Sequence, residues 1–326
     1  MSETPIDVLV LRKGAHGLSV DPYAEELRRR LPDRSVRVAS TPSEERELIG
    51  NAAVVTGVSI DPDVLSETER LRLFACTWAG TGHLPMEELR RSGVAVTNAS
   101  GIHAPNIAET VVGQVLMFAR RLHEGWRRKR RREWRHFRMD ELEGSTVTVV
   151  GQGPIGRAVI ERLEGFGVET IGVRYTPSKG GPADTVIGFE EDPFHDALAE
   201  TEYLVLATPL TETTRRLIDE AALETLGPDA YLINVGRGKL VETDALVDAI
   251  RSQFLRGAAL DVTDPEPLPA DHPLWTFENV LITPHNAGHS PKHWPRLAEI
   301  VAGNVRSLEE TESVEELENL VTAPDE

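Results

Sequence analysis

Residues 147–156 read VTVVGQGPIG, an apolar run that leads directly into three closely spaced glycines. The next residues, RAVIERLEGFG, have the apolar spacing of a helix, so the glycines lie between a predicted strand and a predicted helix. A G-x-G-x-x-G pattern in that context is typical of a dinucleotide-binding α/β unit, whereas the bare pattern carries little weight. The alternative is a glycine-rich turn that binds no ligand. The predicted cofactor-binding residues of this turn are Gly151, Gly153, Pro154, Ile155 and Gly156.

Each glycine of this turn has a different predicted role. Gly151 would make the tight turn, Gly153 would let the backbone approach a pyrophosphate, and Gly156 would let the helix pack closely on the sheet. The helix N-terminus would offer free N–H groups and the positive end of its dipole to the phosphates. Pro154 has no N–H and suits the first turn of a helix, so Ile155 is the expected donor.

The strand after this helix, ETIGVR (169–174), ends in a cation where units that prefer NAD usually have an acid. An acid would hold the ribose 2′-hydroxyl and repel a 2′-phosphate, whereas a cation beside hydroxyls suits a 2′-phosphate. We therefore predict a preference for NADP(H). Binding of NAD(H) is the alternative, if the arginine is only a solvated surface residue. The predicted contacts are Arg174, Tyr175, Thr176, Ser178 and Lys179.

Short apolar runs alternate with helical patterns on both sides of this stretch, which predicts two α/β units with parallel sheets. In the first unit, strands are expected at 6–11, 52–57, 72–78 and 94–98, and helices at 22–31, 62–69 and 86–93. In the second, strands are expected at 145–150, 169–174, 203–208, 231–236, 257–262 and 280–283. Long helices are expected over 107–126 and 295–310, with loose residues at the C-terminus. The units would be joined by two crossings, near 99–104 and 287–294.

Composition excludes several classes of protein. The 326 residues carry a formal net charge of −18, with 53 acidic and 35 basic side chains, of which only five are lysine. This balance resembles that of proteins from extreme halophiles, in which molar salt screens the repulsion; an ordinary acidic protein is the alternative. No apolar run reaches the length of a membrane helix, and the N-terminus resembles a strand rather than a signal peptide. We therefore expect a cytoplasmic protein.

One basic segment, RRLHEGWRRKRRREWRHFR (120–138), opposes the acidic background. In isolation it would suggest nucleic-acid binding. In so acidic a chain, Trp126 and Trp134 among arginines favour a packed arm or a subunit contact. We expect neither a nucleic-acid nor a membrane partner.

The sequence offers no convincing metal site. Cys76 is the only cysteine, which excludes intramolecular disulfides and thiolate metal clusters. His285, His289 and His293 recur at the spacing of a helix face, but Pro284 and Pro291 interrupt any helix there. We therefore expect no metal.

Three polar residues follow three of the later strands, at the sheet edge where open α/β sheets bind ligands. They are Arg237 in INVGRGKLVE (233–242), Glu266 in ALDVTDPEPLP (259–269) and His285 in LITPHNAG (281–288). A 2-keto acid needs a cation for its carboxylate and carbonyl, and a proton donor that works near neutral pH. A carboxylate beside the histidine would orient the ring and favour the imidazolium. Singly, each could be a loop residue, a turn residue or a phosphate ligand; together they favour catalysis.

The sequence resembles the D-isomer-specific 2-hydroxyacid dehydrogenase family over nearly its whole length. The resemblance is carried by VVGQGPIG, TPLTETTRRLI (208–218), INVGRGKLVE, ALDVTDPEPLP and TPHNAG, in this order and at family-like spacing. The acidic composition makes it similar to the haloarchaeal members. The resemblance implies a substrate domain, 1–100 with 290–326, that is split by a dinucleotide-binding domain, 101–289, and closes over the reactants.

The resemblance also implies a role for each candidate residue. His285 would protonate the keto oxygen during reduction and act as the base in reverse. Glu266 would pair with His285, and Arg237 would hold the carboxylate and carbonyl. Asp261 would contact the nicotinamide carboxamide. The other implied cofactor contacts are Thr208, Pro209, Thr214, Val235, Gly236 and Gly288.

Substrate binding is expected to involve the loop CTWAGTG (76–82). The resemblance implies that backbone N–H groups of Ala79 and Gly80 bind the substrate carboxylate. Trp78 and Gly82 depart from the smaller residue and the acid that many relatives have, and Trp78 could line the side-chain pocket. Trp78 and, near the crossings, His103 and Trp294 are further substrate-binding candidates, although packing explains each of the three almost as well.

The leading hypothesis is an NADPH-preferring reductase of small 2-keto acids with D stereochemistry, and the resemblance implies a homodimer. A glyoxylate/hydroxypyruvate reductase and a phosphoglycerate dehydrogenase are alternatives within the family. A different class is a corepressor-like module that senses NAD(P). The combination of Arg237, Glu266 and His285 favours an enzyme over that module.

Overall fold

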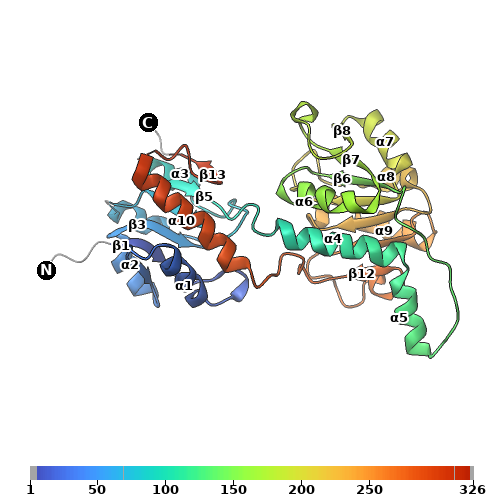
Figure 1. Ribbon diagram of the computed structural model, residues 1–326, viewed down its shortest axis with the longest axis horizontal. Helices are drawn as coiled ribbons and strands as arrows, with labels where there is room; N and C mark the ends of the chain where they lie inside the picture. The colour runs from blue at the N-terminus through green and yellow to red at the C-terminus, as the bar shows by residue number, and fades with distance from the viewer. Residues whose placement is uncertain (1–5, 69, 312, 324–326) are drawn as a thin grey trace. The chain divides into compact units, whose positions relative to one another are not determined.

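The computed structural model describes residues 6–68, 70–311 and 313–323. They form two compact units (Figure 1). The first unit combines the chain up to Ile102 with the chain from Ser290 onwards, and the second is His103–His289. In sequence the second unit is inserted into the first, so the predicted α/β class with a split domain is confirmed. In the described ranges, no helix has the length and apolar content needed to cross a membrane.

The described part of the first unit is built on a sheet of strand order β13-β5-β4-β3-β1-β2. The strands are β1 (Ile6–Val10), β2 (Val36–Val38), β3 (Ala52–Gly57), β4 (Leu73–Cys76), β5 (Ala95–Thr97) and β13 (Leu320–Thr322). The helices are α1 (Asp21–Arg30), α2 (Pro42–Ile49), α3 (Met86–Arg91) and α10 (His293–Thr311). Apolar residues of α1 and α10 cover one face of the sheet, and those of α2 and α3 cover the other.

Two expectations for the first unit are met only in part. The C-terminal residues expected to be loose include β13, which pairs antiparallel with β5 and makes this sheet mixed rather than wholly parallel, whereas residues 324–326 lie outside the described residues. The Asn319 amide fixes the approach to β13, since it donates to the carbonyl oxygens of Asn98 (3.2 Å) and Ser100 (2.9 Å). The helix expected at 62–69 is a 3-10 helix over Pro62–Glu67.

The second unit has a seven-stranded sheet of order β12-β11-β10-β9-β6-β7-β8, in which every neighbouring pair is parallel. The strands are β6 (Thr146–Val150), β7 (Glu169–Val173), β8 (Thr185–Ile187), β9 (Tyr203–Leu206), β10 (Tyr231–Asn234), β11 (Gly257–Leu260) and β12 (Val280–Ile282). The helices are α4 (Ala104–Ala119), α5 (Leu122–Arg131), α6 (Pro154–Leu163), α7 (Glu191–Glu200), α8 (Glu220–Leu226) and α9 (Thr243–Arg251). Helices α4 and α6 pack on one face, and α7, α8 and α9 on the other (Figure 1).

The long helix expected over 107–126 is broken in two. Arg121 has a left-handed backbone conformation, with φ of 46°, which ends the run of helical hydrogen bonds and lets α5 take a new direction. Within α5 the buried carboxylate of Glu124 forms ion pairs with Arg127 and Arg128, and Arg127 also links the helix to Glu278, which precedes β12. Arg128 also lies over the ring of Phe137, at 4.9 Å from its centroid. The segment after α5 thus folds back along the helix, while most of its side chains, Trp134 included, stay exposed.

Candidate active site

The three catalytic candidates follow three adjacent strands at the carboxyl edge of the second unit's sheet. Arg237 follows β10, Glu266 follows β11 and His285 follows β12, and these strands are neighbours in the sheet. Parallel strands bring their carboxyl ends to one edge, which is why residues distant in sequence meet there.

His285 and Glu266 form a hydrogen-bonded pair. The distance from His285 Nδ1 to Glu266 Oε1 is 2.7 Å, and the two side chains are 50 % and 43 % exposed. Because Nδ1 is engaged by the carboxylate, Nε2 is the ring nitrogen left to exchange a proton with a ligand. So exposed a hydrogen-bonded pair adds little stability, and its main effect is to orient the imidazole.

A buried carboxylate fixes the turn that carries His285. Asp261, 3 % exposed, accepts hydrogen bonds from the Thr283 hydroxyl (2.6 Å) and from the N–H groups of Asn286 (2.8 Å) and Ala287 (3.0 Å). The His285 N–H donates to the Asp261 carbonyl oxygen at 2.8 Å. The His285 backbone has φ of 52°, an unusual conformation that these bonds hold in place. This positioning role could not be predicted from the sequence TPHNAG, because it depends on Asp261 lying beside that turn.

Arg237 lies in a loop that is packed against the segment leading to Glu266. A Cβ at Gly238 would collide with the carbonyl oxygen of Thr263, so only glycine allows the two loops to approach this closely. The Asn234 side chain closes the Arg237 loop, because it accepts from the Gly236 N–H and donates to the Arg237 carbonyl oxygen, both at 3.0 Å. The cation and the His285–Glu266 pair therefore lie on neighbouring loops.

The glycine turn has the geometry of a phosphate-binding site. Gly151 has φ of 98°, and a Cβ there would lie 2.6 Å from the carbonyl oxygen of Ala207. A Cβ at Gly156 would collide with the carbonyl oxygen of Gly151, whereas a Cβ at Gly153 would point into open space. Helix α6 begins at Pro154 with no side-chain cap on its first N–H groups. An open backbone beside an uncapped helix N-terminus fits a dinucleotide pyrophosphate.

The predicted ribose-binding residues form an exposed loop after β7. The Arg174 guanidinium donates a hydrogen bond to the carbonyl oxygen of Gly180. Tyr175 is 80 % exposed, and Thr176, Ser178 and Lys179 are also exposed. The loop ends at Asp184, whose carboxylate accepts from the N–H and hydroxyl of Thr170 on β7, at 2.9 and 2.6 Å.

The remaining cofactor candidates lie in turns near the same edge. Thr208 and Val235 are almost fully buried, with 7 % of each exposed. The Thr214 hydroxyl donates to the carbonyl oxygen of Pro209 at 2.7 Å, which closes the turn after β9. A Cβ at Gly288 would be 3.6 Å from the His103 ring, so these two candidates are neighbours.

The candidates of the first unit differ in exposure. Trp78, Ala79 and Gly80 follow β4 and are exposed, and the Ala79 carbonyl oxygen accepts from the Asn98 amide at 2.7 Å. Trp294 is buried in the core of this unit, where its ring stacks on Tyr23 at 4.9 Å. Trp294 therefore has a packing role, the alternative that the sequence left open.

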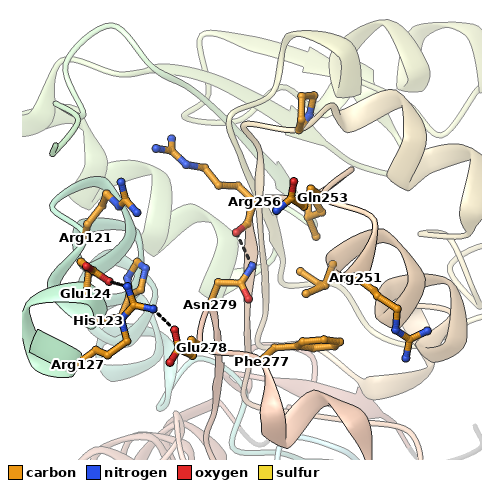
Figure 2. Close-up of a pocket in the computed structure, with 13 residues that line it drawn as sticks. Arg121, His123, Glu124, Arg127, Arg251, Gln253, Arg256, Phe277, Glu278 and Asn279 are labelled. Carbon is orange, nitrogen blue, oxygen red and sulfur yellow. Dashed lines mark hydrogen bonds and ion pairs between the residues drawn. The ribbon is translucent and has the colours of Figure 1, made fainter. Parts of the chain in front are cut away.

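The opposite edge of the second unit's sheet has a separate pocket (Figure 2). It measures about 620 Å³ and is lined by α5 and by the segments that precede β10, β11 and β12. Arg121, Arg127, Arg251 and Arg256 make the lining basic (Figure 2). Since it lies at the amino ends of the strands, it is not part of the candidate active site.

Among the described side chains, no group of three His, Cys, Asp or Glu is placed to hold a metal.

Comparisons with known proteins place the chain in a family and show its fold in other proteins. Residues 112–287 match the family model described as D-isomer specific 2-hydroxyacid dehydrogenase, NAD binding domain. The chain is 36 % identical to a glyoxylate reductase of Aeropyrum pernix over 255 residues, 76 % of each protein.

Two solved structures cover nearly the whole chain. An NADPH-dependent glyoxylate/hydroxypyruvate reductase from Sinorhizobium meliloti is 25 % identical, with a TM-score of 0.73 over 97 % of this chain and 98 % of that one. The NAD complex of a D-isomer specific 2-hydroxyacid dehydrogenase from Lactobacillus delbrueckii is 22 % identical, with a TM-score of 0.82 over 97 % of this chain and 100 % of that one. At 22 % identity, the similarity to the Lactobacillus delbrueckii structure shows a common fold and nothing more.

Proposed function

The chain belongs to the D-isomer specific 2-hydroxyacid dehydrogenase family, a family of NAD(P)-dependent oxidoreductases, and we propose that it reduces a small 2-keto acid of the glyoxylate type with NADPH. The family resemblance inferred from the motifs is thereby confirmed. The observation that carries the proposed reaction is the Glu266–His285 pair beside the Arg237 loop, at the carboxyl edge of a sheet with a dinucleotide-type glycine turn. The similarity to a glyoxylate reductase and to an NADPH-dependent glyoxylate/hydroxypyruvate reductase supports the substrate class.

The proposed mechanism assigns one task to each side chain. The Arg237 guanidinium binds the substrate carboxylate and the keto oxygen, and its charge draws electrons from the carbonyl carbon. A nicotinamide cofactor, when bound at the glycine turn, would supply the hydride that this carbon accepts. His285 Nε2 donates a proton to the keto oxygen as the C=O bond becomes C–OH, and Glu266 stabilises the imidazolium before transfer. The reverse reaction uses neutral His285 as the base.

The proposed preference for NADPH rests on the charge of the loop after β7. Arg174 stands directly after the strand, Lys179 lies in the same loop, and no acid occurs between them. Two cations and three hydroxyls suit a 2′-phosphate, whose oxygens only accept hydrogen bonds. The domain roles, with substrate binding by the first unit and cofactor binding by the second, are part of the same proposal.

Initial rates of NADPH and NADH oxidation with 2-keto acids from glyoxylate to branched-chain acids, in molar KCl, test this function. Arg174→Asp should lower kcat/KM with NADPH and raise it with NADH. Arg91→Asp, in the first unit, changes the net charge equally and should leave the ratio of kcat/KM with NADPH to kcat/KM with NADH unchanged. An unchanged ratio in Arg174→Asp would refute the cofactor preference, and no turnover in a sample that binds NADP(H) would favour a sensor module.

We also propose that the arm formed by α5 and the segment after it contacts a second copy of the chain. Trp134 is fully exposed, and Trp126, Leu122 and Met139 expose 63 %, 54 % and 42 % of their surface. Several exposed apolar side chains on one short segment are typical of an interface. Light scattering after size exclusion should give a dimer mass, and Trp134→Ala should shift the equilibrium toward monomer; a monomeric native protein would refute the interface.

A further inference from the structure

Gln152, between the first two glycines of the turn, is buried without a hydrogen-bond partner. Only 6 % of the residue is exposed, and neither Nε2 nor Oε1 has a partner among the residues that the structure describes. Buried amides are nearly always satisfied, because an unmet donor or acceptor is costly. A polar side chain kept in this state beside an uncapped helix N-terminus suggests that its partner is a ligand.

Two glycines make room for this amide. A Cβ at Gly172, on β7, would collide with Gln152 Nε2, and a Cβ at Gly181 would collide with Gln152 Oε1. The amide therefore lies between the backbone of β7 and the loop that follows that strand. Apolar side chains could fill the same space, so packing alone does not require an amide.

Arg174 also contacts the loop that follows β7. Its guanidinium donates to the carbonyl oxygen of Gly180, the residue before Gly181. Gln152 follows β6 and Arg174 follows β7, and these strands are neighbours in the sheet. Both side chains therefore contact the same turn, Gly180–Gly181. Both side chains can donate hydrogen bonds to an anion, and Lys179 lies in the same loop.

We propose that the Gln152 amide is part of the binding site for the 2′-phosphate of the cofactor. This inference rests on the proposed preference for NADPH. When the phosphate binds, the Gly180–Gly181 turn moves off the amide, Arg174 exchanges the Gly180 carbonyl for a phosphate oxygen, and Gln152 Nε2 donates to another. The phosphate thereby satisfies a donor that has no partner among the described residues of the free protein.

The test is direct binding of two fragments, 2′,5′-ADP and 5′-ADP, to the full-length protein by calorimetry in molar KCl, without turnover. Gln152→Met keeps the volume and removes both polar atoms. It should bind 2′,5′-ADP about tenfold more weakly, the effect of one hydrogen bond to a charged group, and bind 5′-ADP as the native protein does. Its thermal midpoint should be unchanged or higher, because two unsatisfied polar atoms are gone. Gln152→Leu serves if the methionine variant does not fold.

The outcomes separate this inference from the proposed function. If the native protein prefers 2′,5′-ADP and Gln152→Met keeps the full preference, the inference is overturned and the NADPH proposal stands. If Gln152→Met loses affinity for both fragments equally, the amide only shapes the turn, which also overturns the inference. If the native protein binds both fragments equally, the NADPH preference and the inference fall together.

Discussion

His285 shows how single residues define this site. Its backbone has φ of 52°, a region that asparagine tolerates better than alanine does. We therefore predict that His285→Asn keeps the fold and the binding of cofactor fragments but lowers kcat for keto-acid reduction by about 10²–10⁴-fold, the usual effect of losing a general acid. His289→Ala, in the same segment and exposed, should retain its rate. Rates near normal in His285→Asn would remove this residue from the mechanism.

Asp261 should couple stability to catalysis. Asn at this position replaces one acceptor oxygen by a donor that would face N–H groups of the 283–287 turn. Leaving buried polar groups unmet should lower the free energy of unfolding by about 1–3 kcal/mol. It should also lower kcat, because the turn that holds His285 loosens. Denaturation curves and rates of Asp261→Asn, compared with exposed Asp271→Asn as the charge control, test this. Native stability in Asp261→Asn would contradict the positioning role.

The sequence indicates the candidate residues of the site better than it indicates the residues that hold them in place. The positions of Arg237, Glu266 and His285 follow from the ends of predicted strands, which parallel pairing brings to one edge. The burial of Gln152 and the bonds of Asp261 depend on segments 20 or more residues away, such as Gly172 and Ala287, and no local pattern encodes them. Trp294 was ambiguous for the same reason, because its burial depends on packing against Tyr23.

Among the elements, strands in clear apolar runs were predictable, and strands that mix apolar with polar residues were not. The expected strand at 52–57 matches β3 in full, because its six residues form a central, buried strand. The three-residue strands β5 and β12 were also expected, within 94–98 and 280–283, whereas β2 (VRV) and β13 (LVT) are equally short and do not stand out from the polar sequence around them. The break between α4 and α5 occurs at an arginine, a residue that favours helices, so tertiary contacts of α5 override the local preference.

The link between β7 and β8 should respond to pH. The hydroxyl and N–H of Thr170 hold the pKa of Asp184 below its usual range. A lowered carboxyl pKa in the folded state adds stability above the unfolded pKa, near 3.9, and this stability is lost as pH falls through the folded pKa. Asp184→Asn should therefore lower the urea midpoint at neutral pH, and the difference should shrink in acid. Thr170→Val should lower the urea midpoint by a similar amount, and the double variant should be no less stable than either single variant. A difference in midpoint between the native protein and Asp184→Asn that does not change with pH would exclude this link.

For the whole molecule, the net charge of −18 predicts that salt stabilises the fold. Raising KCl from about 0.1 M to 1 M shortens the Debye length from ~10 Å to ~3 Å. This screening weakens exposed ion pairs such as Arg34–Glu309, each of which contributes little, but it also weakens the long-range repulsion of a chain in which acidic side chains exceed basic ones by 18. We therefore expect the thermal midpoint to rise steeply over this range. Sucrose at equal osmolality, which does not screen charge, should give a smaller rise. A midpoint that falls with KCl would mean that the ion pairs dominate, and it would remove the basis for the likeness to salt-adapted proteins.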